Sequence, residues 1–332
     1  MRWAVLEVED LHVEFRTRDG VARVLNGVTY RVHAGETLAV LGESGSGKSV
    51  TAQAVMGILD TPPAFVTRGS VRFHGEELLT ASPERRRAVR ASGVAMIFQD
   101  ALSALNPVFT VGFQIEEQLR LRRGMTRKEA RARAVELLDL VRIPSAKQRV
   151  REYPHQFSGG MRQRAMIAMA LALDPEVLIA DEPTTALDVT VQAQIMDLLR
   201  EIQRERSMGL VLITHDLGVV AEVADRIAVM YAGRIVEEAD AVSLFRSPGH
   251  PYTAALMRSL PRLDSSKHSA LETIRGLPPS LLRIPPGCPF HPRCPRAEAV
   301  CAVDVPAFVP LGSVPGVGRG SACHFAEEVV RG

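Results

Sequence analysis

The sequence of 332 residues lacks several features that define common functional classes. Its 40 Lys and Arg residues are nearly balanced by 38 Asp and Glu residues, which leaves a formal charge of +2. The positive field that nucleic-acid binding usually needs is therefore missing. No apolar run approaches the ~20 residues of a membrane-spanning helix, and residues 1–10 show no signal-peptide pattern. We expect a cytosolic protein that is held at a membrane only by other chains.

Cysteine is absent from the first 287 residues, and aromatic residues make up only 5% of the chain. The hydrophobic share of 46% is enough for one substantial α/β core with a smaller appendage. All four cysteines follow: Cys288, Cys294, Cys301 and Cys323. Without an export signal, such a cluster indicates metal or redox chemistry rather than disulfides.

Short, continuous apolar runs predict strands that are buried on both faces of a parallel sheet. These runs lie at residues 37–41, 94–98, 177–180 and 210–214. Residues 226–236 have the pattern of a hairpin, which would close a main domain of residues 1–247. Prolines then become frequent, so we expect an extension of residues 248–332 without long regular elements.

Helical patterns alternate with these strands. Residues 48–59 predict a helix that ends before two prolines, and the stretch after Asp188 predicts an amphipathic helix. Thr126 and Glu129 have the spacing of a capping box at the start of another helix. We therefore expect an inserted helical subdomain over about residues 101–172.

A glycine-rich segment between a predicted strand and a predicted helix matches the phosphate-loop pattern G-x-x-x-x-G-K-[ST]. Its backbone N–H groups and the helix N-terminus would surround phosphate oxygens. Lys48 would reach the β- and γ-phosphates, and Ser49 would supply an oxygen to Mg²⁺. The predicted ATP-binding residues here are Gly42, Glu43, Ser44, Gly45, Ser46, Gly47, Lys48 and Ser49.

Two carboxylates end the apolar strand that begins at Val177. Asp181 is the expected second holder of the metal. The next residue, Glu182, is our candidate for the general base that polarises the attacking water. An aromatic side chain must also select the adenine base, and Phe15 is our candidate, although a phenylalanine at a strand end is as often part of the core.

Four further elements distinguish among phosphate-loop proteins. The segment 157–163 resembles the ABC signature, Gln99 the Q-loop, 186–188 the D-loop, and His215 the switch histidine. The resemblance implies that two subunits close head to tail, so that each ATP lies between one phosphate loop and the partner's signature. It assigns ATP contacts to Ser158, Gly159, Gly160 and Asp188, catalytic roles to Gln99 and His215, and Mg²⁺ binding to Gln99 beside Ser49 and Asp181.

Finer details resemble the ATPase subunits of bacterial dipeptide and oligopeptide importers. They are the segments 96–107, 153–155 and 248–253, together with the late cysteines. Ala101 and Phe157 depart from the usual proline and leucine of that family, and we expect altered loop stiffness at most. The implied fold is an α/β ABC ATPase core with an inserted helical subdomain and a Pro-rich, four-cysteine extension.

The resemblance also implies partners and an activity. ATP hydrolysis would drive transport at the cytoplasmic face of the cell membrane, through two permease subunits. A homologous second ATPase would complete a heterodimer, and an extracytoplasmic binding protein would supply specificity. Importers of nickel chelates or glutathione share these motifs and stay open as alternatives. A soluble ABC ATPase acting on DNA or ribosomes usually has a second cassette or a coiled-coil insertion, and neither occurs in this sequence.

The cysteine spacing contains no C-x-x-C pair, which argues against a ribbon-type zinc site. Four thiolates and nearby cations would suit a [4Fe–4S] cluster, and the importer ATPases that this chain resembles carry such a motif. Zinc is the second possibility, and free or buried thiols the third. The nearby cations are His291, Arg293, Arg296 and His324.

Overall fold

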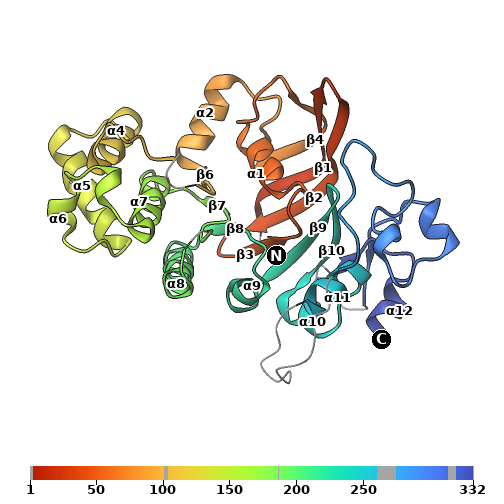
Figure 1. Cartoon of the computed structure of the whole chain (residues 1–332). Helices are drawn as coiled ribbons and strands as arrows, with labels where there is room; N and C mark the ends of the chain where they lie inside the picture. The colour runs from red at the N-terminus through yellow and green to blue at the C-terminus, as the bar shows by residue number, and fades with distance from the viewer. Residues whose placement is uncertain (1–2, 101–103, 186, 260–273, 313–318, 332) are drawn as a thin grey trace. The chain divides into compact units, whose positions relative to one another are not determined.

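The computed structural model describes residues 3–100, 104–185, 187–259, 274–312 and 319–331 (Figure 1). The chain forms two compact units, each built from separated segments. The first comprises residues 1–6, 32–36 and 73–213, and the second comprises residues 7–31, 37–72 and 214–332. Among the described helices, none has both the length and the apolarity that crossing a membrane requires.

Three parallel strands form the centre of the first unit. They are β6 (Val94–Ile97), β7 (Val177–Asp181) and β8 (Gly209–Ile213), with β7 in the middle. Every residue of β7 and β8 is buried, as expected for strands covered on both faces. The predicted strand at 94–98 ends one residue early, at Ile97, and the Phe98 side chain beyond it is 41% exposed. The carboxyl ends of these strands place Gln99 and Glu182 at one edge of the sheet.

Helices make up most of the rest of this unit. They are α2 (Pro83–Ser92), α4 (Val111–Arg123), α5 (Arg127–Leu140), α6 (Ala146–Arg149), α7 (Gly159–Leu171) and α8 (Val189–Arg206), with the short strand β5 (Glu76–Glu77). The predicted capping box is confirmed, since Thr126 Oγ1 accepts the Glu129 N–H and Glu129 accepts the Thr126 N–H. Helices α4 to α7 gather on one side of β6 to β8 (Figure 1), and α5 packs on α4, α6 and α7.

The second unit contains strands from both ends of the chain. Most of the residues of three strands lie in this unit. These strands are β1 (Ala4–Thr17), β2 (Gly20–His33) and β4 (Ala64–Phe73), and they pair in one sheet in the order β2-β1-β4. Five further strands of this unit are hydrogen-bonded in the order β11-β12-β10-β9-β3. They are β3 (Thr37–Leu41), β9 (Arg226–Tyr231), β10 (Arg234–Asp240), β11 (Val309–Pro310) and β12 (Gly320–Ser321). Between β9 and β10, Ala232 and Gly233 both have positive φ, which suits the predicted tight hairpin.

The helices of the second unit are short. They are α1 (Lys48–Met56), α9 (Leu217–Val223), α10 (Ala241–Arg246), α11 (Pro251–Arg258) and α12 (Ala326–Arg331). The predicted end of the first helix at residue 59 is wrong. Gly57 adopts a left-handed conformation with φ 61° and its N–H bonds back to Ala54, so the helix stops before the two prolines. The predicted domain limits at residues 247 and 248 remain a prediction.

Candidate functional site

Three glycines of the phosphate loop adopt positive φ, each in different surroundings. At Gly42, a Cβ would lie 2.2 Å from the carbonyl oxygen of Met230 in β9. At Gly47, it would lie 2.8 Å from Leu25. Gly45 has open space around it, but its φ of 78° strains any other residue. The loop between β3 and α1 therefore needs glycine at these positions, as the motif predicts.

The Lys48 side chain is buried against its own loop. Its Nζ donates hydrogen bonds to the carbonyl oxygens of Gly42 at 2.7 Å and Glu43 at 3.1 Å. The N-cap residue of α1 is Gly47, which offers no capping side chain to the first N–H groups of the helix. Within the described residues, the buried Oγ of Ser46 also has no hydrogen-bond partner. An ammonium group, helix N–H groups and a hydroxyl thus surround a place suited to an anion.

Gln99 and Glu182 are brought together at the ends of β6 and β7. The Gln99 amide Nε2 donates to Glu182 Oε2 at 2.9 Å, and the hydroxyl of Thr185 donates to the same oxygen at 2.9 Å. Glu182 itself has φ 46°, although its N–H still bonds to Ile213 of β8. Asp181 is buried at the end of β7. Left-handed backbone at a non-glycine residue is often found at functional sites. The hydrogen bond from Thr185 to Glu182 was not predicted from the sequence.

The predicted signature begins helix α7. Ser158 is the N-cap, and its Oγ accepts the N–H of Met161 at 3.3 Å. A Cβ built on Gly159 would lie 3.6 Å from Leu187 Cδ2. A Cβ built on Gly160 would lie 2.8 Å from Val191 Cγ1, which is too close. Asp188 is the N-cap of α8 and accepts the N–H of Val191. The signature and the segment around Asp188 therefore pack together within one unit.

Three other predicted positions have less distinctive surroundings. Phe15 is half-buried in β1, and His215 is exposed just before α9. Phe157, which departs from the family pattern, is buried. Ala101 and Ala186 lie outside the described residues.

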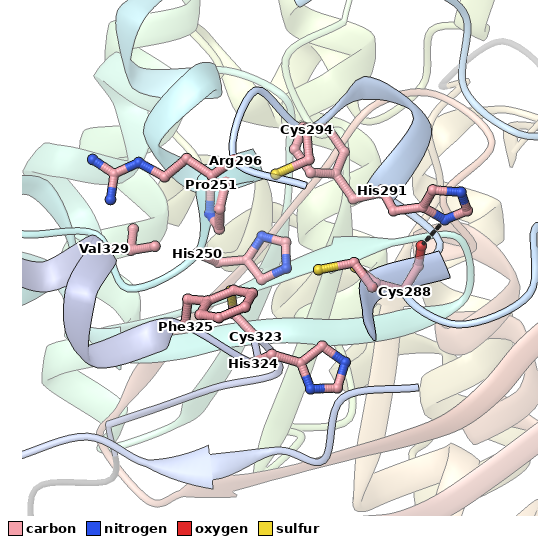
Figure 2. A pocket seen from close by; sticks show the side chains of 12 residues that line it. His250, Pro251, Cys288, His291, Cys294, Arg296, Cys323, His324, Phe325 and Val329 are labelled. Atoms are coloured by element: carbon pink, nitrogen blue, oxygen red, sulfur yellow. Dashed lines mark hydrogen bonds between the residues drawn. The ribbon is translucent and has the colours of Figure 1, made fainter. Parts of the chain in front are cut away.

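The four cysteines line a single cavity in the extension, although they come from separate segments (Figure 2). Burial raises the pKa of the Cys288 and Cys294 thiols and raises the pKa of Cys323 to about 11. His250 also lines this cavity, and burial lowers its pKa to about 3. Its Nδ1 accepts the N–H of Tyr252. His250 Nδ1 is thus engaged in capping α11, and the four thiols are the ligands that the sequence predicts.

The geometry of the cysteines bears on the two metal hypotheses. Across the described part of the chain, no three or more His, Cys, Asp or Glu side chains are close enough to hold a single metal ion. A tetrahedral zinc site with Zn–S bonds of about 2.3 Å needs closely spaced sulfurs. The described residues therefore give no support from geometry to either the zinc or the iron–sulfur hypothesis. A [4Fe–4S] cluster takes one thiolate per iron.

Arg293 does not have the predicted position. His291, Arg296 and His324 line the cysteine cavity as expected from the sequence, but Arg293 turns to the phosphate loop. Its guanidinium donates to both carboxylate oxygens of Glu43, at 2.6 and 3.0 Å. Tyr252 OH accepts the Glu43 N–H at 2.9 Å. No local sequence pattern predicts these contacts, because they join residues more than 200 positions apart.

Comparisons with known proteins agree with this arrangement. The ABC transporter family profile matches residues 25–185, and the profile of the oligopeptide/dipeptide transporter C-terminal region matches residues 236–301. The chain is 52% identical over 308 residues to the oligopeptide transport ATP-binding protein OppD of Salmonella typhimurium, covering 92% of this chain and 91% of that one. It is 51% identical over 297 residues to the dipeptide transport ATP-binding protein DppD of Bacillus subtilis, covering 90% and 88%.

Solved structures show the same fold over the larger part of the chain. The dimeric ABC transporter cassette MJ0796 matches with a TM-score of 0.64 and 27% identity, over 71% of this chain and 98% of that one. CbiO1 of Clostridium perfringens, part of an ABC transporter complex, matches with a TM-score of 0.62 and 29% identity, over 73% and 90%. The α/β fold with an inserted helical subdomain is therefore that of an ABC ATPase cassette.

Proposed function

Because this chain belongs to the ATP-binding subunits of ABC-type dipeptide and oligopeptide transporters, we propose that it is the ATP-hydrolysing motor of a peptide importer. The observation that carries the proposal is the pair of Gln99 and Glu182, held 2.9 Å apart at the ends of two parallel strands. The phosphate loop, with its buried Lys48, is the proposed element for binding the phosphates. A carboxylate oriented by an amide suits the activation of water better than a structural role.

Each residue has a proposed role in the hydrolysis of ATP. Gly42 to Ser49 bind the phosphates through backbone N–H groups and Lys48, and Phe15 stacks on the adenine. Ser49, Gln99 and Asp181 offer the oxygen ligands that Mg²⁺ prefers. The metal would neutralise charge that develops on the phosphates. Glu182 takes the proton of the attacking water, and His215 assists at the γ-phosphate.

The signature completes the site of another subunit. Ser158, Gly159 and Gly160 form an anion-binding turn at the start of α7, and Asp188 lies in the adjoining segment. The match to a dimeric cassette supports an arrangement in which this turn meets the ATP of a partner. Closure on ATP and reopening after hydrolysis would then move the permeases.

The names of the relatives, a dipeptide and an oligopeptide transport ATP-binding protein, support a peptide cargo. We propose that two permease subunits, a second homologous ATPase and an extracytoplasmic binding protein complete the importer. The subunit lies at the cytoplasmic face of the membrane, where the helical subdomain contacts the permeases. The binding protein and the permeases select the peptide, and this subunit binds the nucleotide.

We further propose that Cys288, Cys294, Cys301 and Cys323 hold a [4Fe–4S] cluster. The observation that supports the proposal is that all four thiols line one cavity. When bound, the cluster supplies a covalent cross-link among separate chain segments and a possible one-electron redox centre. The protein's own part is to bury the thiols in a cavity that His291, Arg296 and His324 also line, where Arg296 adds positive charge.

The substitution Glu182→Gln tests the proposed catalytic role. It removes the base but keeps the size and the contact to Gln99, so MgATP still binds while hydrolysis slows by roughly 10²–10⁴-fold. Lys48→Ala instead abolishes binding. The exposed Glu222→Gln is the matched control and leaves both steps unchanged. ATP binding and phosphate release are measured on the assembled complex, and parental hydrolysis by Glu182→Gln would refute the role of Glu182.

A further inference from the structure

Glu43 is an acidic residue inside a loop whose ligand is a polyanion. Its side chain is 24% exposed, and Arg293 contacts both of its carboxylate oxygens. The Arg293 side chain is only 5% exposed. A bidentate pair of this kind fixes the direction of the carboxylate as well as neutralising it. Glu43 is therefore held from the C-terminal extension, across 250 positions of sequence.

Arg293 is itself held in place by several contacts. Its Nε donates to the carbonyl oxygen of Arg275 at 3.1 Å, and its Nη1 donates to Tyr231 OH at 3.3 Å. Its guanidinium carbon lies 5.8 Å from the ring centre of Tyr231 and 5.9 Å from that of Phe290. These contacts place the guanidinium before nucleotide binds, so the clamp on Glu43 needs little reorganisation.

The backbone of Glu43 makes hydrogen bonds with Lys48 and with the turn of the phosphate loop. Its carbonyl oxygen accepts hydrogen bonds from Lys48 Nζ at 3.1 Å and from the Ser46 N–H at 3.2 Å. Its own N–H donates to Tyr252 OH, which α11 of the same unit provides. A displacement of Glu43 would therefore move both Lys48 and the turn that presents N–H groups to phosphate.

We propose that Arg293 is a positioning residue of the ATP site, which fixes the phosphate loop through Glu43 and cancels a charge that would repel the triphosphate. The inference rests on the proposed role of residues 42–49 in binding ATP. It also gives the extension a part in that site, since Arg293 directly precedes Cys294 in the turn between Cys288 and Cys294. Cys288 and Cys294 line the cavity, while Arg293 faces the loop.

The test compares MgATP affinity and steady-state kinetics of the full-length subunit and of the assembled complex. Arg293→Ala raises the dissociation constant and the KM for MgATP by about ten- to one-hundred-fold, as loss of a charge-assisted pair implies. Arg293→Lys keeps the charge without the fork and gives an intermediate increase. Increasing salt weakens the effect of Arg293→Ala, because the repulsion between Glu43 and phosphate is screened.

A second substitution separates charge from packing. In the Arg293→Ala background, Glu43→Gln removes the unpaired carboxylate, and the double variant binds MgATP about tenfold more tightly than Arg293→Ala alone. A purely structural clamp predicts no such recovery, so a double variant that binds no better than the single one overturns the proposal. Thermal unfolding of each variant and comparison with Arg293→Lys keep the result interpretable if Arg293→Ala folds poorly.

Two controls separate this inference from the assignment of the ATP site. Arg283→Ala removes an exposed arginine from the same extension and leaves affinity unchanged. Lys48→Ala abolishes MgATP binding. If Lys48→Ala abolishes binding while Arg293→Ala leaves the affinity and KM at parental values, the positioning role is wrong and the ATP site stands. If Lys48→Ala binds MgATP normally, the ATP site itself is wrong.

Discussion

A substitution at Gly159 can separate an effect on the stability of this subunit from an effect on the hydrolysis of ATP bound by a partner subunit. Gly159 is the first residue of α7, and the atom nearest to a Cβ built on it is Leu187 Cδ2 at 3.6 Å. That distance is an ordinary van der Waals contact, and the φ of Gly159 is not in the left-handed region. Gly159→Ala therefore fits the subunit without any displacement.

The expected effects on stability and on activity have different sizes. Alanine in place of glycine at a compatible helical position adds up to about 1 kcal/mol of stability. At about 2–4 °C per kcal/mol, the melting temperature stays the same or rises by up to about 4 °C. ATP hydrolysis by the assembled complex falls by about 10²-fold, because the new methyl group displaces phosphate from a preorganised N–H donor.

Calorimetry of the subunit and steady-state ATPase assays of the complex measure the two effects. Gly160→Ala is the contrasting variant, since its Cβ would lie 2.8 Å from Val191 Cγ1. It lowers stability, and adding Val191→Ala restores stability without restoring hydrolysis. Parental ATPase activity of Gly159→Ala, with an unchanged melting temperature, would show that no nucleotide approaches this turn.

Two further predictions concern the extension and β10. Each Cys→Ser substitution at the four positions lowers the iron and acid-labile sulfide of anaerobically purified protein from about four per chain, and stoichiometric zinc without iron would contradict the cluster. Glu237→Gln costs roughly 1–3 kcal/mol in denaturant unfolding, because Glu237 accepts the N–H groups of both Gly249 and His250 and glutamine keeps one acceptor. Burial raises the pKa of Glu237 above 4.5, so over the interval between the two values the folded state holds a proton that the unfolded state has released. The contribution of Glu237 to the free energy of unfolding is thus fully present below about pH 4.5 and is lost as pH rises through the raised pKa. Glu237→Gln removes this dependence of the free energy of unfolding on pH. The same pH dependence in parent and variant would exclude Glu237 as its source.

The parts of the site that follow local rules were predictable from the sequence. The phosphate loop lies between a buried strand and a helix, and its glycines have the positive φ that the motif requires. The contact between Gln99 and Glu182 also follows from pattern, because the carboxyl ends of adjacent parallel strands meet at one edge. The helix α1 ends earlier than predicted because Gly57, in a left-handed conformation, terminates it ahead of the prolines at 62 and 63.

The role of Arg293 was not predictable for a physical reason. Its neighbours along the chain are cysteines and a histidine, so proximity in sequence suggested that its charge serves the cysteine cavity. In a 3₁₀ turn, successive side chains point in different directions, and the turn 291–293 sends Arg293 to Glu43. The packing of the extension, including Phe290, on the ring of Tyr231 contributes to that choice.

The segment 248–253, which the sequence offered only as a family marker, has a physical role in this structure. Glu237 binds the N–H groups of Gly249 and His250, and His250 in turn caps α11 by accepting the Tyr252 N–H. Pro251 fits at the start of that helix, where its missing N–H costs nothing. The buried Tyr252 then receives the N–H of Glu43. Gly249, His250 and Pro251 thus help to fix the Tyr252 hydroxyl group that supports the phosphate loop. Loss of Glu237 should therefore loosen Glu43 from one side as loss of Arg293 loosens it from the other.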